Sequence, residues 1–200
     1  MIRLARLDAA AISAELGRSN PAFSYSEVGA TARPDDLAAL ASRYTLDRRR
    51  FVVGRGRDDF ARARVALFDW RHFEIPWLEL HGAREPVHPS QIVATSTRVF
   101  GVWFLNPCRV VDRIDPPGET NEVSFAYGTL AGHVACGEER FSLRRDPRTD
   151  EVAFEILAFS RPALIVTRLG RPWMRRVQRR FAAAASDALA AAACRRAVPT

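Results

Sequence analysis

The sequence predicts an α+β fold, in which a curved antiparallel sheet of about six or seven strands packs on one long C-terminal helix. Two changes in the hydrophobic pattern carry this prediction. The pattern alternates with a period of two from Trp77 to Phe159, and it becomes helical after Pro172. The chain has 200 residues, of which 48% are hydrophobic and 26% charged, so it can bury a core. We expect a single domain, 1–200, built from an N-terminal helical extension (1–22), a strand and helices (23–76), the sheet (77–160) and the C-terminal helix (161–200).

Residues 8–72 carry helical spacing and capping residues, interrupted by one short strand. The expected elements are a helix from Asp8 to Leu16, a strand from Phe23 to Val28, a helix from Leu37 to Tyr44, and a helix that Asp58 or Asp59 caps and that ends near His72.

Six segments with alternating polarity are the expected strands of the sheet. They are Leu78–His81, Gln91–Phe100, Val102–Ile114, Glu122–Leu130, Glu138–Arg145 and Val152–Phe159. Turn sequences around Pro116 and Pro147 separate neighbouring strands by short loops, which indicates antiparallel hairpins. An antiparallel sheet with one buried face needs a cover, and an amphipathic helix after Pro172 can supply it. Trp173 and Phe181 lie on the apolar stripe of that helix, so we expect both to be buried against the sheet.

Parity along the strands selects one carboxylate as a candidate for acid–base chemistry. Glu139 shares a face with Phe141, whereas Glu138 falls on the opposite face, which we expect to be solvated. A carboxylate among apolar residues is costly unless it is paired. We therefore expect Glu139 to reach Tyr127, His133 or an arginine, and the first two partners would make a catalytic group of Tyr127, His133 and Glu139. An arginine partner would make the carboxylate structural, and a bulge near Gly137 would promote Glu138 instead.

Aromatic side chains at strand spacing can line a ligand pocket or simply fill the core. Mixed with a few polar groups, they fit the usual pocket composition. The candidate ligand-binding residues are Trp103, Asn106, Phe125, Tyr127, Phe141, Phe154 and Trp173.

The net charge of +7 is concentrated in one segment, and every basic residue is arginine. Between Arg161 and Phe181 there is no acidic residue. The candidate residues for an anionic partner are Arg168, Arg171, Arg175, Arg176, Arg179 and Arg180. They could form a solvated face whose charge is balanced by acidic residues elsewhere in the chain. They could instead contact an acidic partner or an anionic membrane surface. Nucleic acid is disfavoured, because no base-stacking aromatic residues alternate with these arginines.

Several other sites are disfavoured by spacing. Cys108, Cys136 and Cys194 form no CxxC pair, and the four histidines have no metal-ligand spacing. The Gly54–Asp59 segment has an acid where a dinucleotide loop needs glycine. We therefore expect no metal and no cofactor. The charged N-terminus lacks the apolar run of a signal peptide, so we expect a cytoplasmic location.

Longer motifs carry a resemblance that covers nearly the whole chain. They are Ser24-Tyr-Ser-Glu-Val-Gly-Ala-Thr31, Asn106-Pro-Cys-Arg-Val-Val111, Phe125-Ala-Tyr-Gly-Thr-Leu-Ala-Gly-His133, Gly137-Glu-Glu-Arg-Phe141, Phe159-Ser-Arg-Pro162 and Gln178-Arg-Arg-Phe181. The chain resembles the family filed as domain of unknown function 1990, a resemblance that implies no particular activity. In architecture alone, the order of elements is similar to START-like and Bet v 1-like helix-grip proteins and to aromatase/cyclases.

Three functions remain open at this stage. The first is binding of a hydrophobic small molecule between sheet and helix, and the second is a cofactor-independent cyclase, isomerase or dehydratase in the same cavity. The third is an interaction protein that docks through its arginine face. A cavity favours the first two functions, and a core filled by aromatic residues favours the third.

Overall fold

The computed structural model describes residues 2–3, 6, 8–17, 22–99, 101–163 and 171–194, and for 2–3, 9, 15, 34 and 171–174 it describes the backbone alone. The described strands form one antiparallel sheet in the order β2-β8-β7-β6-β5-β4-β3, with β1 paired to β5. The strands are β1 Ile2–Arg3, β2 Thr45–Arg55, β3 Leu78–His81, β4 Ile92–Val99, β5 Val102–Ile114, β6 Glu122–Thr129, β7 Ala135–Arg145 and β8 Glu151–Pro162. The helices are α1 Ala9–Gly17, α2 Pro34–Leu40, α3 Gly56–Phe68 and α5 Arg171–Cys194, with short 3-10 turns η1 at Ala30–Ala32 and η2 at Arg71–Phe73.

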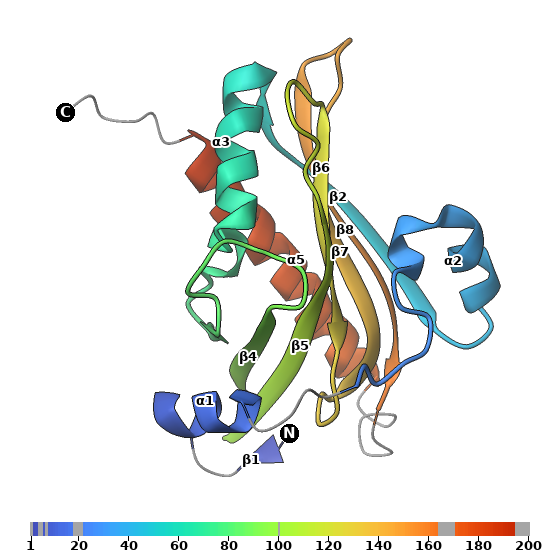
Figure 1. The fold of residues 1–200 in the computed structure, drawn as a ribbon, viewed down its shortest axis with the longest axis vertical. Coiled ribbons are helices and arrows are strands. Elements are labelled where there is room, and N and C mark those ends of the chain that lie inside the picture. Colours follow the sequence, from blue (N-terminus) through green and yellow to red (C-terminus); the bar gives the residue numbers. More distant parts are fainter. Residues whose placement is uncertain are drawn as a thin grey trace.

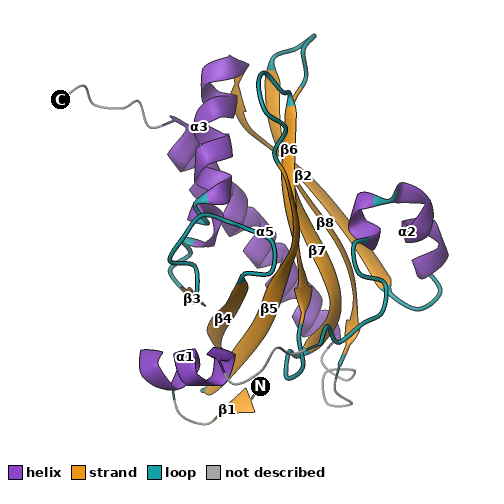
Figure 2. Cartoon of the chain, viewed as in Figure 1, coloured by secondary structure: helices purple, strands orange, loops and turns teal. Residues whose placement is uncertain are grey.

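The sheet is curled, and helices lie on both of its faces (Figure 1). We call the face toward α3 and α5 the inner face and the face toward α2 the outer face (Figure 2). The main core lies between the inner face and these two helices. Its fully buried side chains include Phe125, Phe141 and Phe154 from three adjacent strands and Leu189 from α5.

The structure confirms the predicted α+β architecture of a curled antiparallel sheet with a long C-terminal helix. All six predicted strands are present, and β3 and β5 have the predicted bounds. Helix α5 begins one residue before Pro172. Proline suits the first turn of a helix, because the backbone N–H that it lacks would have no hydrogen-bond partner there. Asp8 caps α1 as expected, since its Oδ1 accepts the Ala11 N–H at 2.7 Å.

The region before the sheet departs most from the prediction. Thr45–Arg55, which we did not predict as a strand, is β2 and pairs along its length with β8. Phe23–Val28 is not a strand; it makes a single bridge, between Phe23 and Leu130. Helix α2 ends at Leu40 rather than Tyr44, and α3 starts at Gly56, ahead of the predicted caps. Asp59 instead lies inside the first turns of α3, and its Oδ2 accepts the Arg55 N–H at 2.7 Å.

Residues 23–44 cover part of the outer face, and two glycines in the sheet permit close approach. A Cβ on Gly128 would lie 2.0 Å from the Tyr25 hydroxyl, so the Tyr25 ring rests where a side chain would stand. Gly137 has a φ of +154°, and a Cβ there would lie 1.9 Å from the Phe159 carbonyl oxygen. Glycine is therefore required at both positions.

No helix within the described residues has the combination of length and apolarity that crossing a membrane requires.

Candidate functional site

A cavity of about 180 Å³ lies between the inner face of the sheet and the first half of α5. Small residues of β7 and β8 (Ala135, Gly137 and Ala158) form part of its wall, so the cavity exists because these strands carry little side-chain bulk there. Polar groups enter from several strands. The lining includes Thr95, Thr97, Asn106, Tyr127, His133, Glu139 and Gln178 among the polar residues, and Phe73, Trp77, Leu78, Val177 and Phe181 among the apolar ones.

Tyr127 and Glu139 form the central polar pair of the cavity. They are directly opposite partners in the β6–β7 ladder, which places both side chains on the inner face. The Tyr127 hydroxyl donates a hydrogen bond of 2.7 Å to Glu139 Oε2. The β7–β8 register continues through Gly137 without a shift, and the β6–β7 register is unbroken as far as the Gly128–Glu138 pair. The parity argument that selected Glu139 is therefore confirmed in its geometry.

The surroundings of Glu139 favour its protonated form. Burial raises the pKa of the Glu139 carboxyl to about 7; the Tyr127 hydrogen bond opposes this rise, and the charge of Asp47 adds to it. Burial and the Glu139 charge also raise the pKa of the Tyr127 hydroxyl well above its usual value. Among the described residues no arginine lies within ion-pair distance of Glu139. The structural alternative, a buried arginine pair, is thus absent from this part of the chain.

His133 and Asn106 line the same cavity from its other side. His133 Nδ1 lies 2.9 Å from the Ala135 nitrogen, whose N–H can only donate, and 3.0 Å from the Ala135 carbonyl oxygen, which can only accept, so the tautomer of the ring decides which of the two hydrogen bonds is made. Burial lowers the pKa of His133 to about 3, which keeps the ring neutral at physiological pH. Asn106 Oδ1 accepts a long hydrogen bond of 3.5 Å from the Val134 N–H. The structure therefore brings Tyr127, His133, Glu139 and Asn106 to one cavity and links the first and third directly.

The other candidate ligand-binding residues lie elsewhere. Phe125, Phe141 and Phe154 have no exposed surface and pack around the ring of His72, so they fill the core instead of lining the cavity. Trp103 lies on the outer face, where the Arg6 guanidinium stands 5.6 Å from its ring. The side chain of Trp173 falls outside the described residues. Aromatic residues thus fill the middle of the inner face, and the cavity is confined to one end.

Phe181, expected to be buried, is only half-buried. Its ring lies 5.3 Å from that of Phe73 and 6.5 Å from that of Phe141, at the wall of the cavity. Helix α5 is nevertheless docked, because Ala185 and Leu189 in its second half are fully buried.

Sequence parity failed on the outer face of β7, where Glu138 is buried and not solvated. Glu138 Oε2 accepts hydrogen bonds from the Tyr25 hydroxyl at 2.8 Å and the Gly29 N–H at 2.7 Å, and Oε1 accepts the Thr31 N–H at 3.0 Å. Beside it, buried Arg140 makes an ion pair of 2.5 Å with Asp112. The sequence motif from Ser24 to Thr31 was the signal that could have shown Glu138 to be buried, since its residues supply the hydrogen-bond donors that satisfy this carboxylate.

A β-bulge in β5 makes the Arg140 pair available. The β5–β6 register shifts between Val110 and Asp112, so Val110 faces the core while Asp112 turns to the outer face. After the shift Arg113 turns inward, where its guanidinium lies 3.9 Å from the Phe68 ring centre.

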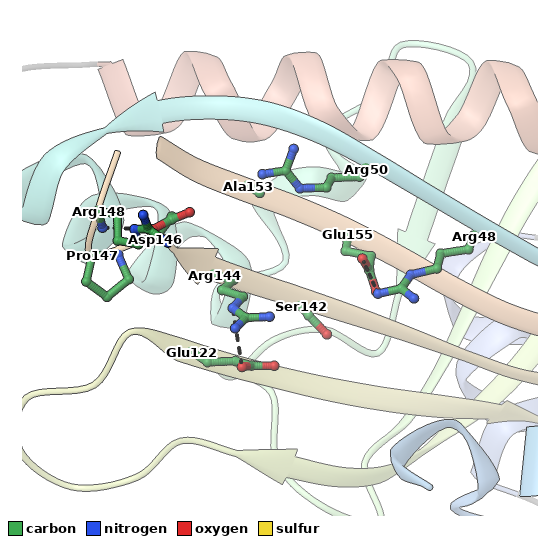
Figure 3. A pocket seen from close by; sticks show the side chains of 10 residues that line it. All are labelled: Arg48, Arg50, Glu122, Ser142, Arg144, Asp146, Pro147, Arg148, Ala153 and Glu155. Atoms are coloured by element: carbon green, nitrogen blue, oxygen red, sulfur yellow. Dashed lines mark hydrogen bonds and ion pairs between the residues drawn. The ribbon is translucent and has the colours of Figure 1, made fainter. Parts of the chain in front are cut away.

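The uncovered part of the outer face carries a wider hollow, of about 630 Å³ (Figure 3). The strand arginines of this hollow come from β2 and β7 and already meet carboxylates: Arg48 lies 3.0 Å from Glu155, and Arg144 lies 4.0 Å from Glu122. Because opposite charges are paired along its walls, this hollow offers a ligand less than the inner cavity does.

The arginine face of α5 is exposed. Arg175, Arg176, Arg179 and Arg180 are exposed, and Arg180 stacks over Trp77 with its guanidinium 4.7 Å from the ring centre. Arg168 and the side chain of Arg171 fall outside the described residues.

Comparison with known proteins places the chain among relatives from distant organisms. It is 31% identical over 160 residues to a UPF0548 protein of Dictyostelium discoideum, covering 76% of this chain and 74% of that protein. It is 37% identical over 145 residues to a UPF0548 protein of Deinococcus radiodurans, covering 68% of this chain and 71% of the relative.

Solved structures share the fold at low sequence identity. A hypothetical protein from Helicobacter pylori aligns with a TM-score of 0.53 at 12% identity, over 74% of this chain and 86% of that one. An aromatase/cyclase from Streptomyces aligns with a TM-score of 0.50 at 15% identity, over 76% of this chain and 94% of that one. These likenesses establish the helix-grip fold alone.

One family description, "Domain of unknown function (DUF1990)", matches residues 24–188, which include strands β2 to β8, most of α5, and both Glu138 and the residues that donate hydrogen bonds to it. The chain therefore belongs to the DUF1990 family.

Proposed function

We propose that this protein binds a small hydrophobic molecule in the cavity between the sheet and the first half of α5. The observation that carries the proposal is the cavity itself, in which Tyr127 and Glu139 form a hydrogen-bonded pair within a wall that includes Phe73, Trp77 and Phe181. Apolar walls with a few convergent polar groups are typical of small-molecule sites.

The size and polarity of the cavity constrain the ligand. About 180 Å³ is smaller than the roughly 300–1,000 Å³ that holds a drug-sized molecule. The ligand is therefore compact, or only part of it enters. It carries an oxygen or nitrogen acceptor, because a protonated Glu139 in the wall of the cavity offers a proton.

Native mass spectrometry of protein purified from its own host tests the proposal, with Ala158→Leu as the blocking variant. Ala158 lines the cavity, so leucine there fills it; Ala191→Leu, on the exposed face of α5, adds the same bulk elsewhere. We expect a bound small molecule in the wild type and in Ala191→Leu and its loss from Ala158→Leu. Retention of the same molecule by Ala158→Leu, or a bare wild type, would contradict the proposal.

A second candidate function is acid–base catalysis in the same cavity by a cofactor-independent cyclase, isomerase or dehydratase. The observation that favours it is the Glu139 pKa of about 7, because a catalytic acid is most effective when its pKa lies near the working pH. In this reaction Glu139 would donate or accept the proton and Tyr127 would orient it. His133, in the tautomer whose Nδ1 accepts the Ala135 N–H, would hold the reacting oxygen through Nε2–H.

Glu139→Gln separates catalysis from binding, since the amide keeps the shape and removes the transferable proton. The molecule that Glu139→Gln retains from the host is incubated with each protein, and its mass and retention time are followed. Under catalysis, the wild type converts it and Glu139→Gln binds it unchanged. Equal conversion by both proteins would exclude Glu139 as the acid.

A further inference from the structure

Four arginines crowd the exposed face of α5 over little more than one turn. Arg175, Arg176, Arg179 and Arg180 stand at helical positions i, i+1, i+4 and i+5, and all four are exposed. The remaining exposed positions of this face toward the C-terminus are Ala183, Asp187, Ala191 and Cys194, so the positive charge is confined to the first half of the helix.

These arginines differ from most of those on the sheet and on α3. Arg62 and Arg64 of α3 lie 2.5 and 2.6 Å from carboxylates, and Arg48 and Arg140 of the sheet lie 3.0 and 2.5 Å from theirs. Within the described ranges, none of the four arginines on α5 makes an ion pair. The alternative in which acidic residues elsewhere in the chain balance the charge of this face is therefore not met within those ranges.

The spacing of these arginines also sets like charges against one another. Arg175 and Arg179 are four residues apart on α5, as are Arg176 and Arg180, and like charges at that spacing destabilise a helix. The first turn of α5 has no acidic residue that would offset this repulsion, and an external anion relieves it.

We propose that the face formed by Arg175, Arg176, Arg179 and Arg180 docks the protein on an anionic lipid bilayer. Bilayers attract basic patches through many mobile headgroups, so they need no matching apolar contact. The exposed large apolar side chains of the described chain, Leu46, Val52, Val65 and Ile114, all lie on other elements. A protein partner would need such an apolar centre, and the described side chains of α5, at 175–194, expose none.

Nucleic acid fits this face less well. The four arginines span about 7.5 Å along the helix at 1.5 Å per residue, which is too short to track a run of phosphates. Trp77 is the aromatic ring in contact with the patch, and Arg180 already covers it. Tryptophan at the edge of a basic patch is the usual residue of the membrane–water interface.

Docking by this face would also bring the cavity close to the lipid. The cavity-lining residues Val177, Gln178 and Phe181 alternate along α5 with the docking arginines. Trp77 also lines the cavity, and its ring packs against Arg180 of the docking face. The docking proposal does not depend on ligand binding, because charge alone carries it.

Vesicle binding tests the proposal with a pair of charge-matched variants. Phosphatidylcholine vesicles with and without phosphatidylserine are sedimented with the wild type, with Arg176→Gln/Arg179→Gln, and with Arg84→Gln/Arg148→Gln. Both variants remove two positive charges from exposed positions, but only the first removes them from α5. Arg180 is left in place because it packs on Trp77.

We expect the wild type to bind only the vesicles with phosphatidylserine and to release as salt rises. Each arginine contributes roughly fivefold to such binding, so Arg176→Gln/Arg179→Gln should bind roughly 25-fold more weakly while Arg84→Gln/Arg148→Gln stays near the wild type. Equal losses in both variants would reduce the effect to net charge and overturn the proposal. Binding to polyglutamate or to single-stranded DNA that matches or exceeds vesicle binding would also overturn it, in favour of an acidic protein or a nucleic acid.

Discussion

Glu138 and Glu139 are adjacent carboxylates in opposite environments, and they differ in how many hydrogen-bond donors each one meets. Glu138 accepts hydrogen bonds from backbone and side-chain donors of residues 25–31, which satisfies its charge. Glu139 has a single hydroxyl donor, Tyr127, and borders a cavity. A satisfied carboxylate fixes structure, whereas a carboxylate with one donor in a cavity retains the capacity to exchange a proton or bind a ligand.

Replacing Glu139 by glutamine should change how stability depends on pH. The folded pKa of about 7 lies above the usual 4.5, so the folded state holds a proton that the unfolded state has released between these values. Wild-type stability should therefore fall as pH rises from about 4.5 to 7, by at most about 3 kcal/mol because the side chain is only partly buried. Glu139→Gln should lack this fall, which denaturant unfolding at both pH values measures. A constant difference between the two proteins across this range would contradict the raised pKa.

His72 is a second buried titratable residue, and the candidate site does not use it. It has no exposed surface and is enclosed by the rings of Trp70, Phe73, Phe125, Phe141 and Phe154. Within the described chain neither ring nitrogen has a hydrogen-bond partner. Burial lowers its pKa to about 3, so the folded core accepts only the neutral ring.

His72→Phe should therefore resist acid better than the wild type. The unfolded chain protonates this histidine near pH 6.5 and the folded chain only near pH 3, so wild-type stability is lost as pH falls between them. The free energy of unfolding of the wild type, relative to that of His72→Phe, should fall by about 4 kcal/mol by pH 3. Guanidinium midpoints across this pH range measure it, with near-neutral pH as the reference for the packing change itself. Parallel pH profiles for the two proteins would show that His72 titrates normally.

At the level of elements, the alternation of polar and apolar residues predicted each strand that has one clearly apolar face. It failed for β2, where Asp47 and three consecutive arginines obscure the apolar positions Phe51 and Val53. Residues 23–28 have strand composition but follow the outer face and contribute one donor to Glu138, the Tyr25 hydroxyl. Propensity alone cannot separate these cases, because the pairing partner decides which segment becomes a strand.

Helix α5 should tolerate loss of bulk at its cavity end better than at its docked end. Leu189 is fully buried, so Leu189→Ala should cost about 2–5 kcal/mol. Phe181 is half-buried, and Phe181→Ala should cost roughly half of the 3–5 kcal/mol typical of a fully buried phenylalanine. Chemical denaturation of the two variants compares them directly. A larger loss for Phe181→Ala would mean that the first half of α5, and not the second, anchors the helix.

In the whole molecule, the sequence located the polar pair of the cavity but not the cavity's extent. Cross-strand parity found Tyr127 and Glu139, because it depends only on register. It could not show that Phe125, Phe141 and Phe154 would pack around His72 and fill the middle of the inner face, since that packing joins three strands to η2. The result combines a filled aromatic core with a cavity at one end, where small residues of β7 and β8 leave space.

The same limit explains the outer face. Alternation assigns residues to two faces but does not reveal how many faces are covered. Residues 23–44 cover the part of the outer face that holds Glu138 and Arg140, whereas the hollow bordered by Arg48 and Arg144 is open. Covering both faces at one end fixes β7 in place, and it holds Glu139 against the cavity.

The most direct test of this account is the pKa of Glu139 itself, followed by NMR of the side-chain carboxyl carbon through a pH titration. The account predicts a midpoint of about 7 in the wild type. It also predicts a higher midpoint in Tyr127→Phe, because the hydrogen bond from Tyr127 favours the charged form. A wild-type midpoint near 4.5, unchanged in Tyr127→Phe, would mean that water reaches the carboxylate freely and that the cavity holds no proton-bearing group.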